Sequence, residues 1–319
     1  MSCCIPVILT HIRFQLSFYR NMTIHLFILQ SLVSAALYTK VKLGGGHELQ
    51  RMSYVELRGQ VSFLSQLFRG EFIFPTEGLD INLAQTIKTL EADNVIKVTR
   101  NPDAEDEVQF VELSDKERET GRESFDFYCF LIWPFIEAAW LGAISLLMLT
   151  PPVGAKKETW LDQKKVQDRA QLFGKTLYHQ GDLSYFEAVN KETLKNTYTR
   201  FEEEGMILPL KSKDSKVPST IRLSDEWMPL RSTETGVIDA RGQLWVFAER
   251  ISSSRREGKN RRDGATVQSR VLSLADRVGK ELWEEAVVKE GLDVEDMRAV
   301  QVRANGRTRR KRLAVPAML

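Results

Sequence analysis

A repeated order of predicted elements constrains the fold of this chain more than any other feature. Two segments with helical periodicity are followed by two short strands joined by a turn, and the same order then occurs a second time. The predicted elements are helices at 54–67 and 80–91 with strands NVIKVT and VQFVEL, then helices at 164–177 and 191–204 with strands GMILPL and TIRLSDE. The segment Leu90–Ile96 corresponds to Phe201–Ile207. We therefore predict an internal duplication of a winged-helix-like unit.

An apolar segment at residues 12–41 precedes the first unit. Its apolar residues recur every three or four positions, which predicts one helix packed on nearly all sides, and Gly44–Gly46 then ends it. Three polar residues interrupt this segment. Asn21 and His25 are four positions apart and therefore lie one above the other, next to Arg20. We expect a local polar cluster on a helix that is otherwise apolar.

A second apolar segment, 125–149, lies between the two units. Its length is close to the approximately 20 residues that span a bilayer, but it contains Asp126, Glu137 and Pro134. A charged side chain at mid-bilayer costs about 3 kcal/mol on insertion scales, and proline interrupts helices. We therefore expect two buried or membrane-facing helices rather than a true span. The side chains expected to act as membrane or core anchors are Trp133 and Trp140.

The end of the chain differs in composition. From Arg250 onward it carries 17 Lys and Arg against 10 Asp and Glu, whereas the preceding part is net acidic. Two amphipathic helices are predicted at 242–251 and 271–290, followed by the basic sequence NGRTRRKR. We expect a mainly α fold: a helical bundle with two small winged-helix-like units carrying short β-hairpins, plus a flexible basic C-terminal tail. The expected modules are residues 8–120, the hydrophobic helices with the second unit at 121–210, and a partly disordered extension at 211–319.

Little in the sequence indicates chemistry. Three unpaired cysteines favour a reducing compartment and exclude the spacing of a zinc site. Gly44–Gly46 lacks the following lysine of a phosphate loop, so no nucleotide cofactor is expected. The second helix of each unit is too acidic for a DNA groove. We therefore expect no metal, no cofactor and no nucleic acid, although a winged-helix nucleic-acid binder stays open as a third hypothesis.

The stretch FYRNMTIHLF resembles a known family, the bacterial-type glycerol-3-phosphate acyltransferases and the related dihydroxyacetone-phosphate acyltransferase, in their C-terminal region. The matching residues are Tyr19, Arg20, Asn21 and the run from His25 to Leu32. The order that follows is also similar: a turn near LFRGEF, an aromatic helix like RESFDFYCFLIW, and a final module ending in FEEEGMI. The resemblance covers residues 8–207.

The resemblance implies a chemistry that this sequence does not carry. In that family, a His-x-x-x-x-Asp motif supplies a general base and the carboxylate that orients it. The residues five positions after the four histidines are Leu16, Gln30, Met52 and Ser184. We therefore expect no catalytic residue in this chain, a catalytic domain that precedes it, and a replaced or mispredicted start at Met1–Val7.

These observations lead to one leading interpretation and one alternative. The leading one is the helical C-terminal region of a glycerol-3-phosphate or dihydroxyacetone-phosphate O-acyltransferase, inactive alone, with acyl-CoA as substrate of the complete enzyme. Its expected partners are the N-terminal acyltransferase domain and an intracellular membrane surface. The residues expected to form the domain interface, or to contact the acceptor phosphate, are Tyr19, Arg20, Asn21 and His25. The alternative is a non-catalytic module that binds a membrane or a protein.

Overall fold

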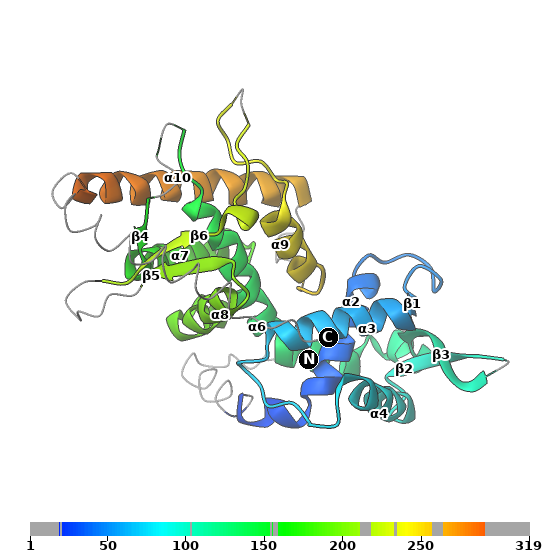
Figure 1. Cartoon of the computed structure of the whole chain (residues 1–319). Helices are drawn as coiled ribbons and strands as arrows, with labels where there is room; N and C mark the ends of the chain where they lie inside the picture. The colour runs from blue at the N-terminus through cyan, green and yellow to red at the C-terminus, as the bar shows by residue number, and fades with distance from the viewer. Residues whose placement is uncertain are drawn as a thin grey trace, which may run out of the picture. The chain divides into compact units, whose positions relative to one another are not determined.

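The computed structural model describes residue 19 and residues 21–102, 104–153, 155, 159–210, 218–232, 235–256 and 264–290 (Figure 1). The chain divides into two compact units. The first combines Met1–Ala139 with Arg250–Glu257, and the second combines Trp140–Glu249 with Gly258–Leu319. The predicted basic tail lies outside the described residues. Whether 8–120, 121–210 and 211–319 behave as separate domains stays a prediction.

The first unit contains a helical group and a three-stranded antiparallel sheet. Its elements are η1 (Ile24–Leu26), α2 (Ile28–Val41), β1 (Met52–Ser53), α3 (Tyr54–Leu67), α4 (Leu79–Ala92), β2 (Ile96–Asn101), β3 (Ala104–Leu113), α5 (Asp115–Thr120) and the first part of α6 (Glu123–Ser145). Helix α2 packs against α3 and α4, and the strand order is β1-β3-β2. The core forms where the apolar faces of these three helices meet.

The second unit repeats this arrangement. Its elements are the end of α6, η2 (Leu146–Leu149), β4 (Leu161–Asp162), α7 (Gln163–His179), η3 (Phe186–Val189), α8 (Lys191–Glu203), β5 (Ile207–Leu210), β6 (Thr220–Leu223), η4 (Asp225–Trp227), most of α9 (Gln243–Ser253) and α10 (Gly264–Glu290). The strand order β4-β6-β5 matches that of the first sheet. The mainly α fold with two winged-helix-like units is confirmed.

The sequence did not predict the first strand of either sheet, because each has only two residues. In the first unit, Met52 pairs with Val111, and Ser53 also accepts a hydrogen bond from the backbone N–H of Glu56 at 3.3 Å, which caps α3. In the second, Leu161 pairs with Ile221 and the next residue caps α7 in the same way. A two-residue strand is too short to show alternation.

The turn before each hairpin supports the duplication in backbone detail. Asn94 and Gly205 both have a positive φ, 56° and 74°. In each unit the next residue donates its N–H back to the last turn of the helix: Val95 to the Leu90 carbonyl and Met206 to the Phe201 carbonyl, both at 2.9 Å. This is the left-handed helix end that asparagine and glycine tolerate best. The predicted correspondence of the two segments therefore matches their backbone conformations.

The predicted helices differ from the observed ones in three regions. The expected pair within 125–149 is a single helix, α6, which continues through Pro134. Its side chains are largely buried, so packing outweighs the backbone hydrogen bond that proline removes. The expected helix at 12–41 is interrupted, because Ile24–Leu26 forms a 3-10 turn and Phe27 leaves the helical region. Helix α10 is longer than predicted, with 27 residues.

Candidate functional site

The N-terminal segment, residues 12–27, precedes α2, and its described part is mostly exposed. Between residues 19 and 26, the side chain of Ile24 is buried, whereas Tyr19, Asn21 and His25 face solvent. Arg20 lies outside the described residues. The prediction of packing on nearly all sides is therefore wrong for this stretch, because the 3-10 turn ends the helical periodicity before α2. It holds for α2 itself, where residues 31–38 are all buried.

His25 contacts the loop between α3 and α4. Its Nδ1 accepts a long hydrogen bond, 3.5 Å, from the backbone N–H of Ile73, and its ring meets the edge of Phe72 with centroids 5.7 Å apart. Phe72 in turn stacks edge-on with Phe135 of α6 at 4.9 Å. The predicted polar residue thus connects the N-terminal segment to the loop at 68–78, the region of the quoted turn LFRGEF.

Large apolar side chains are exposed on both sides of this contact. Leu26, which follows His25 in sequence, is 73% exposed. Ile73, whose backbone N–H contacts the His25 ring, is 79% exposed. Phe27 packs on Phe127 of α6 at a centroid distance of 6.2 Å. We use the name apolar face for the exposed large apolar side chains of these three segments: Tyr19, Met22, Leu26, Ile73, Phe127 and Phe130. Exposed apolar residues grouped in this way are typical of interaction surfaces.

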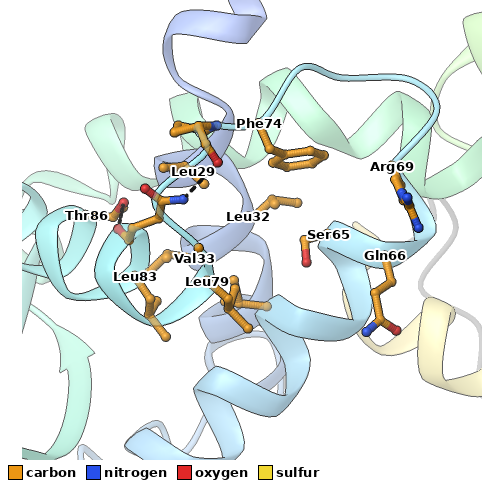
Figure 2. A pocket seen from close by; sticks show the side chains of 14 residues that line it. Leu29, Leu32, Val33, Ser65, Gln66, Arg69, Phe74, Leu79, Leu83 and Thr86 are labelled. Atoms are coloured by element: carbon orange, nitrogen blue, oxygen red, sulfur yellow. Dashed lines mark hydrogen bonds between the residues drawn. The ribbon is translucent and has the colours of Figure 1, made fainter. Parts of the chain in front are cut away.

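A cavity of about 240 Å³ lies beside this region, between α2, α3, α4 and the loop that joins α3 to α4 (Figure 2). The residues that line it are Leu29, Leu32, Val33, Val61, Ser65, Gln66, Arg69, Phe74, Pro75, Gly78, Leu79, Asn82, Leu83 and Thr86. Most are apolar, and Arg69 carries the only charge among them. The walls of the cavity are therefore those of an apolar binding pocket that also contains one cationic side chain.

The two tryptophans predicted as anchors are both buried. Trp133 is 4% exposed and packs edge-on against Tyr38 at 5.0 Å, and Trp140 is 5% exposed. The segment from Glu123 to Leu149 is long and apolar enough to cross a membrane, but 89% of its most apolar window is buried inside the protein. A soluble core helix passes the same test, so length and composition do not decide whether it meets lipid.

The described histidines and the cysteine show no arrangement for covalent chemistry. His47 lies 3.8 Å from the Glu112 carboxylate, and Asp182, three residues after His179, pairs with Arg270 at 2.8 Å. Complete burial raises the pKa of the Cys129 thiol, so this group stays protonated at neutral pH. Among the described residues, no group of three or more His, Cys, Asp or Glu side chains is placed to hold a metal ion.

Sequence reasoning missed the cavity. It singled out the turn that carries Arg69 but gave no role to that residue. The signal that could have found the cavity is a comparison of the two units, in which Val33 and Ser65 line the cavity and glycines, Gly142 and Gly174, stand at the corresponding positions of the second unit. A change from larger residues to glycine between two copies of one fold indicates that the side chains between the helices pack differently.

The family comparison agrees with the quoted resemblance. A sequence model described as glycerol-3-phosphate acyltransferase C-terminal region matches residues 5–209. A search of curated proteins found no match. The matched range begins before the N-terminal segment, contains the apolar face and the cavity, and ends within β5 of the second unit. Because it covers more than half of the sequence, this chain belongs to the family of glycerol-3-phosphate acyltransferase C-terminal regions.

Proposed function

We propose that this chain is the helical C-terminal region of a glycerol-3-phosphate or dihydroxyacetone-phosphate O-acyltransferase, and that it works with a catalytic domain carrying the His-x-x-x-x-Asp motif. The family match supports a role in the context of glycerolipid acyltransferases. The motif does not occur in its 319 residues. The observation that carries the proposal is the apolar face, since three of its members, Tyr19, Met22 and Leu26, lie in the segment that bears the family's tyrosine, asparagine and histidine.

The apolar face suits a protein partner because polar groups interrupt it. Tyr19, Asn21 and His25 supply hydrogen-bonding side chains among exposed apolar ones. Protein interfaces combine an apolar centre that excludes water with hydrogen bonds that fix orientation. In this proposal Leu26 and Ile73 are the central contacts, and burial of each contributes about 1.5–3 kcal/mol to association before the costs of ordering.

Activity and complex formation test the proposal together. The isolated chain should transfer no acyl group from acyl-CoA to glycerol 3-phosphate above background. Mixed with the separately expressed catalytic domain of a family member, it should elute with that domain in size-exclusion chromatography and raise its activity. Turnover by this chain alone would contradict the proposal, and so would the absence of a complex.

Charge placed in the apolar face identifies the surface. Leu26→Asp and Ile73→Asp should each weaken the complex at least tenfold, because a carboxylate would be desolvated at the centre of the contact. Val55→Asp is the matched control, since Val55 is 81% exposed on α3 and lies outside the apolar face. Equal loss of binding in all three variants would assign the effect to general destabilisation and remove the support for this surface.

Arg20 allows a sharper version in which it binds the acceptor phosphate, because guanidinium groups pair with phosphate through two hydrogen bonds. In the reconstituted enzyme, Arg20→Ala would then raise KM for glycerol 3-phosphate and leave the affinity between domains unchanged. If the residue belongs to the interface instead, the affinity between domains falls and KM stays the same.

Membrane association is the second candidate function. In this case the chain would bind a lipid surface and not the catalytic domain. Phe127 and Phe130 are exposed three positions apart on α6, which suits insertion of aromatic side chains at a lipid surface. Sedimentation with vesicles containing anionic lipid tests it. Binding that Phe127→Asp abolishes would favour this function, whereas a chain that stays in the supernatant would dismiss it.

A further inference from the structure

We propose that the cavity between α2, α3 and α4 binds the hydrocarbon chain of a single-chain amphiphile whose anionic head group pairs with Arg69. The site and its chemistry are separate from the apolar face. The inference does not depend on the proposed function, because binding is measured on this chain alone.

The interior of the cavity does not require a ligand with hydrogen-bonding groups. The three polar residues inside it use their side chains within the fold: Ser65 Oγ donates to the Ser62 carbonyl at 2.9 Å, Asn82 Nδ2 to the Pro75 carbonyl at 3.2 Å, and Thr86 Oγ1 to the Asn82 carbonyl at 2.7 Å. Water in such a space would find few partners. A hydrocarbon chain can occupy this space without losing hydrogen bonds to water.

The rim of the cavity carries the opposite chemistry. Gln66, in the last turn of α3, and Arg69, in the turn that follows the helix, are both exposed and both line the cavity. Within the part of the chain that the structure describes, neither side chain makes a hydrogen bond or an ion pair. The nearby loop acids Glu71 and Glu77 do not line the cavity. A carboxylate or phosphate at this rim would meet a guanidinium without displacing an existing partner.

The loop at the rim is held in place. Asn82 is buried on α4, and its amide holds Pro75, so the neighbouring Phe74 ring forms part of the cavity wall above Leu32 (Figure 2). Gly78, with φ of 92°, then lets the chain enter α4. The cavity is therefore formed by three helices and an anchored loop.

The second unit is packed differently at the positions that correspond to two of the cavity walls. There, a methyl group added at Gly142 would lie 2.5 Å from Thr197 Cγ2, and one added at Gly174 would collide with the side chain of Leu141. Thr197 corresponds to Thr86, and both donate their hydroxyl to the carbonyl four residues earlier. In the second unit, side chains of the neighbouring helices therefore fill the space at the two glycines, whereas Val33 and Ser65 line a cavity in the first.

The size of the space selects the occupant. Apolar cavities of about 150 Å³ in proteins already bind a benzene molecule, and about 240 Å³ is available here. A nucleotide or sugar would need polar groups inside, and these are already satisfied. A single chain of medium length with an anionic end fits the walls, the rim and the volume together.

Isothermal titration of the full chain with decanoate, decyl phosphate and decanol, each below its critical micelle concentration, tests the inference. We expect one site, with both anions binding about tenfold more tightly than the neutral alcohol because of the charge-assisted contact. Arg69→Ala should reduce the affinity for the anions to that for decanol. Lys88→Ala, which removes an exposed cation of α4 outside the cavity, is the matched control and should change nothing.

Ser65→Phe fills the cavity and should abolish binding of all three compounds, with folding checked by circular dichroism. If this variant does not fold, Arg69→Ala still decides the outcome. Competition with decanoyl-CoA and with decanoyl lysophosphatidate identifies the source of the chain, and displacement of decanoate by either supports the site. Displacement by neither, equal binding of decanol and the anions, or binding unchanged in Arg69→Ala would overturn the inference.

Discussion

The two winged-helix-like units share a fold but differ in the side chains that lie between their helices. In the first, Val33 of α2 and Ser65 of α3 leave room for a cavity. In the second, Gly142 of α6 lies against α8 and Gly174 of α7 lies against α6. The residues at two helix contacts therefore determine whether side chains fill the space between the helices or leave room for a cavity there.

The units also differ in what the end of the chain adds to each. Residues 250–257 join the first unit, where Arg255 reaches the buried carboxylate of Glu137. Helix α10 joins the second unit, where Gly279 lies against the backbone of Met148 and Trp283 Nε1 donates to the Met148 carbonyl at 3.3 Å. The extension after the hairpin is therefore part of both cores.

The largest effect should come from breaking the buried ion pair of the first unit. Arg255→Met leaves the Glu137 carboxylate, which is fully buried, without its guanidinium 3.6 Å away. Loss of one partner of a buried pair costs about 3–5 kcal/mol. Thermal unfolding should show a marked fall in Tm. Lys97→Met, which breaks the exposed pair with Asp115, should cost less than about 1 kcal/mol; equal losses would contradict a role for Arg255 in the core.

The next effect tests the helix contact of the second unit directly. Gly142→Val installs the residue that the first unit has at this position and should destabilise the protein by about 1–3 kcal/mol, because Thr197 and Phe201 occupy the space. Gly59→Val on α3 is the control, since its added side chain meets nothing within 4 Å. Urea unfolding of both variants provides the comparison. A tolerated Gly142→Val would mean that the helices of the second unit are not held in contact.

A smaller effect distinguishes the second unit by pH. Burial alone would raise the pKa of Asp276, but hydrogen bonds from Lys280 and from Arg231, the latter at 2.5 Å, hold it below its ordinary value. A lowered folded-state pKa stabilises the protein above the unfolded value of about 4 and loses this contribution as pH falls through the folded pKa. Asp276→Asn should therefore cost about 1–2 kcal/mol at neutral pH.

The same variant should match the wild type more closely in unfolding experiments as pH falls below the ordinary aspartate pKa and through the lowered pKa of the folded state, where the carboxyl of the wild type becomes protonated. A stability difference that stays constant from neutral pH into this range would show that Asp276 does not act through its charge.

The smallest expected change in stability compares the turns before the two hairpins, at Gly205 and Asn94. Gly205→Ala places a Cβ at φ of 74° and should cost about 1 kcal/mol through backbone strain alone, since no atom lies within 4 Å of the added carbon. Asn94→Gly at the equivalent position should change stability by less than about 0.5 kcal/mol, because both residues accept φ of 56°. Differential scanning calorimetry resolves the pair. Equal effects would argue against a common turn conformation.

Periodicity and order predicted the two units, because the pattern of apolar residues in a helix or strand is local. It failed where tertiary packing outweighs a local rule: α6 passes through Pro134, and the segment before Phe27 leaves the helix despite its apolar residues. The two-residue strands β1 and β4 have no pattern to read. Each of these features depends on partners far away in the sequence.

The candidate site was predictable in part. The family match confirmed the resemblance from which the motif around His25 was chosen, and the role of these residues stays a prediction. The exposure of the motif was not predictable, because burial depends on the position of the loop near Ile73. The cavity arises where residues near 33, 65 and 83 meet, and no local pattern records a space between side chains.

Hydrogen–deuterium exchange of the full chain, alone and with the His-x-x-x-x-Asp catalytic domain of a family member, tests whether the first unit forms the domain interface. We expect the partner to slow exchange at residues 19–27 and in the loop at 68–78, while helix α7 and the turn that follows it in the second unit exchange as before. Protection confined to the second unit, or absent from both segments of the first, would contradict the assignment of the first unit as the functional one.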